Sequence, residues 1–272
     1  MQTKNFVFCL VFRSVCTKFA IMKKAIVIGA SSGIGMEVAK LLLSEGWSIG
    51  IAARRTDLLL QLKQRNPERV EVETIDVNSE EAEDLLLSLI AVVGGMDLFF
   101  YASGIGKQNT ELQSDIEINT VTTNALGFTR MIGVAYRYMA NHGGGHIAAI
   151  TSIAGTKGLG PAPAYSATKA FQNNYLQALE QQANTRKLNI KFTDIRPGFV
   201  GTALLGDDIK YPMLLKAEDV AYQIIEAVKK EEHIKVIDWR WRIITACWRR
   251  IPRWVWRRLP LKTTKKKAKA SR

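Results

Sequence analysis

The sequence predicts an α/β fold, a doubly wound parallel sheet of about seven strands with helices on both faces. Three observations predict it: short apolar runs alternate with longer segments of helical periodicity, a glycine-rich turn joins the first run to the first helix, and no interdomain linker or internal repeat is evident. With 272 residues, 47% of them hydrophobic, the chain can bury a sizeable core. We expect one folded domain over residues 23–238.

Six apolar runs have the length and composition of buried strands, and a short strand near 234–238 would complete the sheet. The six runs cover residues 24–30, 48–53, 70–76, 96–102, 145–152 and 189–197. The segments between them fit helices over 34–46, 56–66, 79–93, 110–140, 164–187 and 217–231. In the first helix, apolar residues recur at helical spacing until Gly46, a typical C-terminal signal.

The two ends of the chain differ from this body. Residues 1–22 contain the apolar patch FVFCLVF between Lys4 and Arg13, without the small-residue cleavage pattern of a signal peptide. We expect a poorly ordered extension, although a weak signal peptide stays open as an alternative. No run of about eighteen apolar residues occurs, so a spanning helix is not expected. The three cysteines, Cys9, Cys16 and Cys247, lack metal-ligand or redox-pair spacing, which favours a reducing cytoplasm and no metal site.

The positive charge is confined to the C-terminal end. Of 38 basic residues, thirteen lie in residues 239–272, which contain no acid, so residues 1–238 hold 25 basic and 25 acidic residues. Leaving out Lys4, Arg13 and Lys18 as well gives a net charge of −3 for residues 23–238. The formal charge of +13 therefore belongs to a tail. Because the body has no basic platform, nucleic acid is not expected as a partner.

The segment GASSGIG, residues 29–35, follows the first predicted strand and opens the first helix. This is the context that a phosphate-binding turn requires, because the helix N-terminus offers free N–H groups and a positive dipole end. Gly29, Gly33 and Gly35 allow the tight turn and the close approach of a pyrophosphate; Ser31 and Ser32 add hydroxyl donors, and Ile34 completes the segment. We expect a dinucleotide here.

Two arginines indicate which dinucleotide is bound. About twenty residues after the glycine-rich turn, NAD-binding proteins place an acidic residue on the ribose hydroxyls. This chain has Arg54 and Arg55 instead, whose guanidinium groups suit a 2′-phosphate. We expect NADP(H), with two solvated arginines as the alternative.

A tyrosine and a lysine share one helical face in AYSATKAF. Tyr165 and Lys169 lie four positions apart on a predicted helix that follows the strand ending at ITS. This helix would begin near the carboxyl edge of the sheet, where open parallel sheets bind their ligands.

The combination of these residues resembles the short-chain dehydrogenase/reductase family. The matching segments are GASSGIG at 29–35, DV at 76–77, NALG at 124–127, ITSIAG at 150–155, YSATK at 165–169 and RPGFVGT at 196–202. Their order and spacing match throughout, and the resemblance covers residues 23–238.

The resemblance implies a reaction and a role for each residue. Tyr165 would donate a proton to a substrate carbonyl while hydride arrives from the nicotinamide, and Ser152 would hydrogen-bond the same oxygen. Lys169 would favour the phenolate by its charge and hold the nicotinamide ribose. Asn124 would anchor a water that connects the lysine to solvent.

The remaining expected cofactor residues follow from the same resemblance. They are Asp76, Val77, Ala102, Gly104, Pro197, Gly198, Val200 and Thr202. One departure stands out: the family usually has Asn-Asn-Ala-Gly after the fourth strand, whereas this chain has Tyr101 to Gly104 without either asparagine. The segment 203–215 is expected to form a substrate lid.

The tail is basic and rich in tryptophan. Residues 239–272 hold five of the six tryptophans, and Ile244, Trp248 and Val255 recur at helical spacing opposite arginines, with Pro252 as a point for a kink. Such a helix fits the headgroup region of an anionic bilayer. The alternatives are an arm over the substrate pocket or a neighbouring subunit, a polyanion site and a solvated tail.

These observations predict an NADP(H)-dependent oxidoreductase that interconverts a ketone and a secondary alcohol. A tail at a membrane favours a lipid-like or 3-oxo substrate and a cytoplasmic protein attached peripherally to the inner face. Family members commonly form dimers or tetramers, so we expect a homo-oligomer. The alternative is a non-catalytic NADP(H) sensor or scaffold at the membrane.

Overall fold

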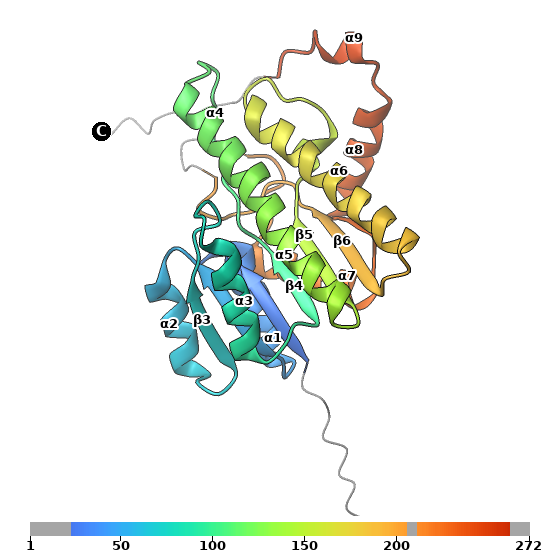
Figure 1. The fold of residues 1–272 in the computed structure, drawn as a ribbon. Coiled ribbons are helices and arrows are strands. Elements are labelled where there is room, and N and C mark those ends of the chain that lie inside the picture. The colour runs from blue at the N-terminus through green and yellow to red at the C-terminus, as the bar shows by residue number, and fades with distance from the viewer. Residues whose placement is uncertain (1–22, 206–210, 262–272) are drawn as a thin grey trace, which may run out of the picture.

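The computed structural model describes residues 23–205 and 211–261, which form a parallel sheet covered by helices on both faces (Figure 1). The strands are β1 (Lys24–Ile28), β2 (Ser48–Ala53), β3 (Val70–Thr74), β4 (Leu98–Tyr101), β5 (Gly145–Ile150), β6 (Ile190–Arg196) and β7 (Ile234–Val236). They lie in the order β3-β2-β1-β4-β5-β6-β7, and every neighbouring pair is parallel. The predicted fold class is confirmed. The expected N-terminal extension lies outside the described residues.

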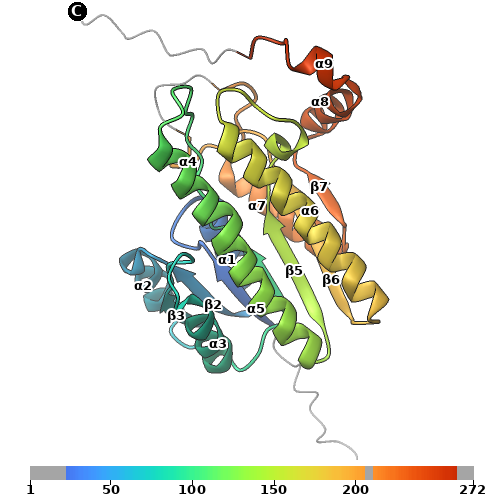
Figure 2. The same cartoon turned by 45° about the horizontal axis from the view of Figure 1, so that its top comes forward.

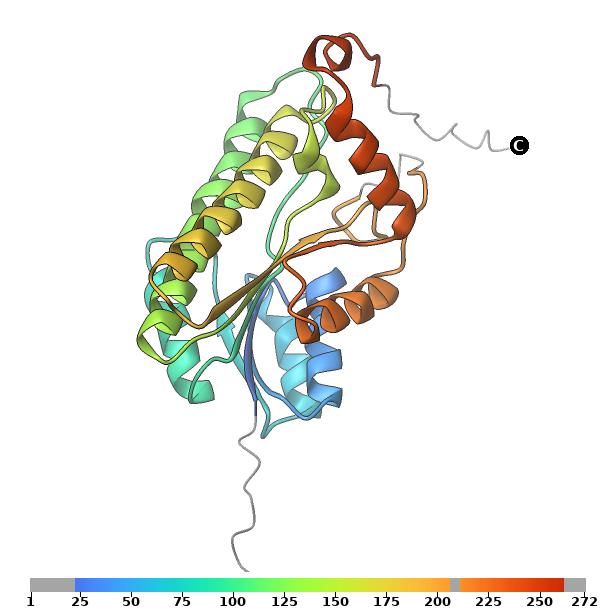
Figure 3. The ribbon, with the colours of Figure 1, turned by 90° about the vertical axis from the view of Figure 1, so that its right-hand side faces the viewer.

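The helices form two layers, which Figure 3 shows edge-on and Figure 2 shows from a tilted view. They are α1 (Gly33–Ser44), α2 (Thr56–Arg65), α3 (Ala82–Val93), α4 (Ser114–Val121), α5 (Phe128–Asn141), α6 (Pro163–Thr185), α7 (Ala217–Lys229), α8 (Trp239–Arg250) and α9 (Arg253–Trp256). Helices α1, α2 and α7 pack on one face of the sheet, and α3, α5 and α6 pack on the other. Alternate residues of β1 supply the two cores, since Ile26 and Ile28 face the second layer and Val27 the first.

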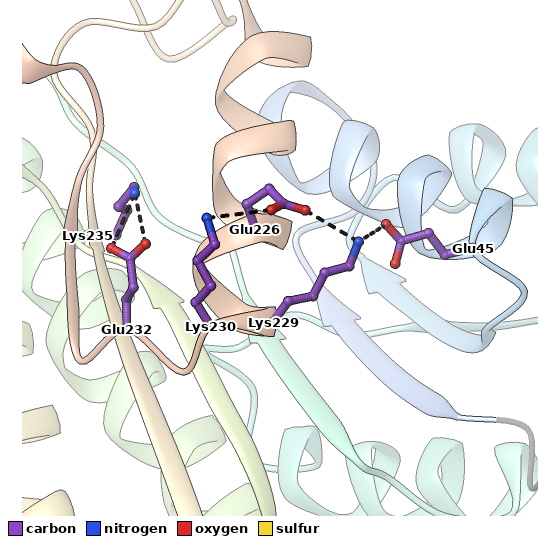
Figure 4. A network of polar contacts seen from close by, with 6 residues as sticks. All are labelled: Glu45, Glu226, Lys229, Lys230, Glu232 and Lys235. Carbon is purple, nitrogen blue, oxygen red and sulfur yellow. Dashed lines mark hydrogen bonds and ion pairs between the residues drawn. The ribbon is translucent and has the colours of Figure 1, made fainter.

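An exposed ion-pair network joins α7 to the end of α1. Lys229 contacts Glu45 and Glu226, and Lys230 also contacts Glu226; Lys235 and Glu232 form a separate pair nearby (Figure 4). Lys229 reaches Glu45 at 2.7 Å, but exposed pairs of this kind contribute at most about 1 kcal/mol. Apolar burial therefore holds the two helices together, with Val38 of α1 and Ile224 of α7 in one buried cluster.

The single helix expected over 110–140 is wrong in its beginning and its continuity. Leu112 has φ 52, outside the helical region, and the Oδ1 atom of Asn109 accepts a hydrogen bond from the Gln113 N–H at 2.9 Å, so α4 begins only at Ser114. A π-helical segment, η1 (Thr122–Gly127), then separates α4 from α5. The helix expected from residue 79 likewise begins later, at Ala82.

The strand order places a crevice at the carboxyl ends of the strands. The chain runs from β1 outward to β2 and β3, and then returns to β4 on the other side of β1. The loops after β1 and β4 therefore diverge. Ligands of open parallel sheets bind in the crevice between two such loops. Among the described residues, no helix is both long enough and apolar enough to cross a bilayer.

Candidate active site

A cavity of about 1210 Å³ opens at the carboxyl ends of the strands. Its lining includes every site residue expected from the sequence except Asn124. These are Gly29, Ser31, Ser32, Gly33, Ile34, Gly35, Arg54, Arg55, Asp76, Val77, Ala102, Gly104, Ser152, Tyr165, Lys169, Pro197, Gly198, Val200 and Thr202. Segments far apart in the sequence are thus brought together at one site.

The glycine-rich turn has a conformation and close contacts that disfavour any residue with a side chain. Gly29 has φ +86, and a Cβ at this position would lie 2.7 Å from the backbone nitrogen of Ser103. A Cβ on Gly35 would lie 2.3 Å from the carbonyl oxygen of Gly29, so α1 packs directly on the turn. The positive end of the α1 dipole consequently opens into the cavity beside Ser31 and Ser32.

The end of β4 stays regular despite the missing asparagines. The Ala102 N–H donates to the Ile28 carbonyl at 2.8 Å and so extends the hydrogen bonding of β1 and β4 beyond the strand. The Tyr101 ring is fully buried and meets Phe128 edge-on at a centroid distance of 5.2 Å. Aromatic packing thus supports this turn, and burial raises the pKa of the Tyr101 phenol.

The arginines after β2 lie beside the glycine-rich turn. The Arg55 guanidinium donates to the hydroxyls of Ser31 at 3.1 Å and Ser32 at 2.6 Å. Arg54 lines the same end of the cavity. Across from them, one carboxylate oxygen of Asp76 accepts the N–H of Asn78 at 3.0 Å, so Asp76 shapes the turn after β3 as well as lining the cavity.

Ser152 and Tyr165 meet at the other end of the cavity. Ser152 caps the short helix η2 (Ile153–Thr156), and its Oγ accepts the Ala154 N–H at 3.0 Å, which leaves the hydroxyl hydrogen free to donate. Tyr165 lies in the first turn of α6, with its ring against Gly106, where a Cβ would approach to 2.8 Å. Burial raises the pKa of the Tyr165 phenol, and its hydrogen bond with Ser152 opposes that rise.

Lys169 lies one turn further along α6 and is buried. Its Nζ donates to the Ile150 carbonyl at 3.1 Å and to Oε1 of Gln172 at 2.9 Å. It lies 5.8 Å from the centroid of the Tyr165 ring. Burial lowers the pKa of Lys169 to about 7, and the carboxylate of Asp194 opposes that shift.

Both ends of the Asn124 amide are occupied by protein. It lies fully buried in η1; its Oδ1 accepts the Ile105 N–H at 2.9 Å, and its Nδ2 donates to the Ile105 carbonyl at 2.7 Å. The backbone carbonyl of Asn124 accepts a hydrogen bond from Nε2 of Gln172 at 2.8 Å. The Gln172 side chain, which the sequence reasoning missed, thus directly joins Lys169 to Asn124. The expected role of Asn124 in anchoring a water stays a prediction.

A second residue missed from the sequence, Glu117 of α4, positions the start of α6. Its Oε2 accepts the Ala164 N–H at 3.1 Å, and its Oε1 accepts from Nδ2 of Asn109 at 2.9 Å. A carboxylate in the first turn of a helix satisfies a free N–H and complements the dipole. Pro163 at the helix start fits the same position because it has no N–H to satisfy. Since Tyr165 follows directly, these contacts set where its phenol lies.

The described part of the tail packs over the cavity. Trp241 and Trp248 of α8 line it, together with Pro260 and Leu261 beyond α9. The Trp241 ring is buried against Gly198, where a Cβ would lie 2.2 Å from its Nε1. Leu204 and Tyr211 line the cavity from the expected lid, whose residues 206–210 lie outside the described part.

Comparisons with known proteins agree with this arrangement. The family model described as short chain dehydrogenase matches residues 23–210. An uncharacterised oxidoreductase of Staphylococcus aureus is 31% identical over 222 residues, which cover 79% of this chain and 94% of that protein. The glycine betaine reductase ATRR of Emericella nidulans is 32% identical over 229 residues and 78% of this chain, but the match spans only 18% of that longer protein.

Solved structures show the same fold. A short-chain dehydrogenase from Streptomyces avermitilis superimposes with a TM-score of 0.74 at 22% identity, covering 83% of this chain and 92% of that one. A variant of actinorhodin polyketide ketoreductase, solved with NADPH, gives a TM-score of 0.69 at 23% identity and covers 79% and 95% of the two chains. The sequence matches, which cover most of the domain, decide the family: this chain belongs to the short-chain dehydrogenases and is an oxidoreductase.

Proposed function

We propose that the protein is an NADP(H)-dependent enzyme that interconverts a ketone and a secondary alcohol, with Tyr165 as the proton donor. One observation carries the proposal: Ser152, Tyr165 and Lys169 converge on a cavity whose other end holds the glycine-rich turn and Arg55. A proton donor and a dinucleotide cradle in one cavity are what carbonyl reduction requires.

Each of the three side chains has a distinct part in the reaction. The Tyr165 phenol would donate its proton to the carbonyl oxygen as negative charge develops there. The hydroxyl of Ser152 would donate to the same oxygen and stabilise that charge. The third Nζ hydrogen of Lys169, beyond its bonds to Ile150 and Gln172, would hold the ribose of the cofactor, while the ammonium favours the phenolate during alcohol oxidation.

The residues present fit a dinucleotide bearing a 2′-phosphate. Because Gly29 has no side chain, a ligand can approach the backbone of the turn closely. The α1 N-terminus beside this turn suits a pyrophosphate. Arg54 and Arg55 supply positive charge where a 2′-phosphate would lie. When bound, the cofactor would supply or accept the hydride.

Exchanging Tyr165 for phenylalanine tests the assignment. We expect Tyr165→Phe to keep NADPH binding, measured by fluorescence titration, and to lower kcat for ketone reduction by at least about a hundredfold, because the proton donor is gone. The alternative, a non-catalytic sensor of NADP(H), predicts no turnover by the wild type with any ketone of a broad panel. A Tyr165→Phe variant that reduces ketones at the wild-type rate contradicts the assignment.

The cofactor preference has its own test. Arg55→Ala should weaken NADPH far more than NADH, because only NADPH carries the phosphate; we expect a loss of about tenfold or more in kcat/KM for NADPH. Arg65→Ala, at the far end of α2, is the control. Equal losses for both cofactors would contradict a 2′-phosphate contact.

The lining of the cavity near Tyr165 favours a lipid-like or 3-oxo ketone. The walls there are apolar, with Leu159, Phe199, Leu204, Trp241 and Trp248 among them. Aromatic and aliphatic walls bind extended apolar groups better than small polar ones. A series of 3-oxo esters of increasing chain length should show KM falling with length; a flat series would exclude this class.

Peripheral contact with an anionic membrane at the inner face is part of the proposal. Trp239, Ile243 and Trp254 of the tail are more than half exposed and lie among arginines. Sedimentation with phosphatidylglycerol vesicles and with phosphatidylcholine vesicles tests it. Binding only to the anionic vesicles, lost on removal of residues 239–272, is the expected result; a full-length protein that stays in the supernatant with both would contradict it.

We also propose a cytoplasmic homo-oligomer. Its support is a set of exposed apolar side chains on neighbouring helices, Ile118 of α4, Leu126 of η1 and Phe171 of α6. Light scattering coupled to gel filtration should give a mass of two or four chains.

A further inference from the structure

A second groove adjoins the catalytic cavity. It measures about 710 Å³ and lies between the loop that follows η2 and the segment around α9. It is lined by Thr110, Gly155, Thr156, Lys157, Gly158, Gly160, Pro161, Ala170, Arg253, Trp256, Arg257, Leu259 and Leu261. Pro161 and Leu261 also line the catalytic cavity, so these two residues form a shared border.

The groove carries positive charge without a counter-charge. Of the described residues that line it, three are cationic, Lys157, Arg253 and Arg257, and none is acidic. The described part of the chain places no carboxylate in an ion pair with any of them, whereas Lys229 and Arg137 are paired elsewhere on the surface. Cations gathered in a concave site repel one another and raise the affinity for an anion.

Specific contacts build this groove from segments nearly a hundred residues apart. The indole Nε1 of Trp256 donates to the Gly158 carbonyl at 2.7 Å, and Nζ of Lys157 donates to the Ile251 carbonyl at 2.9 Å. The Lys157 ammonium retains two further hydrogens for a ligand. Side-chain space next to Gly158 and Gly160 is open, since a Cβ on either would meet nothing within 4 Å. The wall of the groove is thus fixed while its interior is accessible.

We propose that this groove binds a phosphate group carried by the substrate, whose apolar body and ketone occupy the adjoining catalytic cavity. Guanidinium groups recognise phosphate with paired hydrogen bonds, and Lys157 adds a third cation. Trp241 and Trp248 supply the apolar wall on the catalytic side of Leu261. The substrate is then an amphiphile with a phosphate-bearing head, a narrower class than the lipid-like ketone of the proposed function, on which this inference rests.

Two thioesters with the same reactive part test the groove. 3-Oxooctanoyl-coenzyme A carries phosphates, and the N-acetylcysteamine thioester of the same acyl group carries none. The full-length Arg253→Ala/Arg257→Ala variant should raise KM for the coenzyme A thioester about tenfold, with kcat unchanged, and leave KM for the N-acetylcysteamine thioester and for NADPH unchanged. The charge-matched control is Arg242→Ala/Arg249→Ala, which removes two exposed arginines of α8 that line neither cavity.

Three results of these experiments would bear on the groove without deciding whether Tyr165 is the proton donor. Equal effects of the Arg253/Arg257 variant on both thioesters, or equal effects of the two double variants, would overturn this inference. If the variant loses only binding to phosphatidylglycerol vesicles and keeps its KM values, the phosphate belongs to a membrane headgroup and the inference is wrong. Inorganic phosphate should compete with the coenzyme A thioester, not with its phosphate-free counterpart.

Calorimetry covers the case in which no ketone is reduced. The coenzyme A thioester is titrated into full-length Tyr165→Phe protein with and without the Arg253/Arg257 substitutions. Binding that is weakened about tenfold by the substitutions supports the groove even if the proposed reaction fails. Unchanged or undetectable binding overturns the groove, whatever the activity of the enzyme.

Discussion

Lys169 and Tyr165 belong to the same helix face but have different surroundings. Both side chains line the cavity, but the phenol lies beside Ser152, whereas the buried ammonium donates to Ile150 and Gln172. Burial raises the pKa of the phenol and lowers that of the ammonium, so each neutral form is favoured. The polar partners of Lys169 stabilise its charged form and therefore set the pH range in which Lys169 and Tyr165 change protonation.

Of the two hydrogen-bond partners of Lys169, only Gln172 contributes a side chain, so a substitution can change it. Gln172→Leu removes the oxygen that accepts from Nζ of Lys169, so the pKa of the lysine should fall further and the loss of ketone reduction with rising pH should begin at lower pH. Gln172→Glu keeps an oxygen and adds negative charge, so it should move the same midpoint to higher pH. Rate profiles from pH 5 to pH 10 measure both. Lower rates with an unmoved midpoint in both variants would mean that Gln172 is only structural.

The sequence identified residues that belong to contiguous motifs and missed those that act across elements. Ser152, Tyr165 and Lys169 stand in segments whose order and spacing are diagnostic, and all three line the cavity. Gln172 lies outside those segments, and nothing in its neighbourhood reveals that its amide bridges Lys169 to a carbonyl 48 positions away. Trp241 is one of the five tryptophans of the tail, but its contact with Gly198 depends on how the tail folds back over the sheet, which the sequence does not show.

At the scale of elements, α4 contacts the first turn of α6, which carries Tyr165. Glu117→Ala would remove the acceptor for the Ala164 N–H and for the Asn109 amide, so we expect a loss of about 1–2 kcal/mol in the free energy of unfolding. The kcat for reduction should fall too, because the first turn of α6 carries Tyr165.

Two further variants serve as comparisons for Glu117→Ala. Glu117→Gln keeps one oxygen acceptor and should retain part of the stability. Glu111→Ala removes an exposed acid from the preceding loop and should change the unfolding free energy by less than about 0.5 kcal/mol in urea denaturation. If Glu117→Ala is as stable and active as Glu111→Ala, the carboxylate does not position α6.

Hydrophobic periodicity located the elements well where a single period persists. It predicted the cores of all seven strands, but it merged α4, η1 and α5 because apolar residues continue through the π-helical segment. The π-helical segment η1 packs closely on its neighbours, which hydrophobic periodicity does not show. At Gly127, for example, an added Cβ would lie only 2.8 Å from Cγ2 of Val77. In the tail, Pro252 did mark the break, because a proline cannot donate the next helical hydrogen bond, and α8 ends at Arg250.

At the scale of the whole molecule, three buried charges connect α6 to strand β6 of the sheet. Asp194 of β6 pairs with Arg196 at 2.5 Å and accepts from the Thr151 hydroxyl, and its negative charge also supports Lys169. Both partners of the Asp194–Arg196 pair are almost fully buried. The protonation of Lys169 is therefore linked to the stability of the folded domain, not only to activity.

Comparing the wild type with Lys169→Met over a pH series tests this linkage. The folded pKa of Lys169, about 7, lies below the ordinary value of 10.5, so between these values the unfolded chain binds a proton that the folded protein does not. The unfolding free energy of the wild type should consequently rise with pH relative to the variant, by up to about 1.4 kcal/mol per pH unit, from pH 7 toward pH 10. Below pH 6 the difference should be constant, since both states then hold the proton. Urea denaturation at half-unit steps measures the difference, and a constant difference between pH 7 and pH 9.5 would show that the ammonium is accommodated in the core without cost.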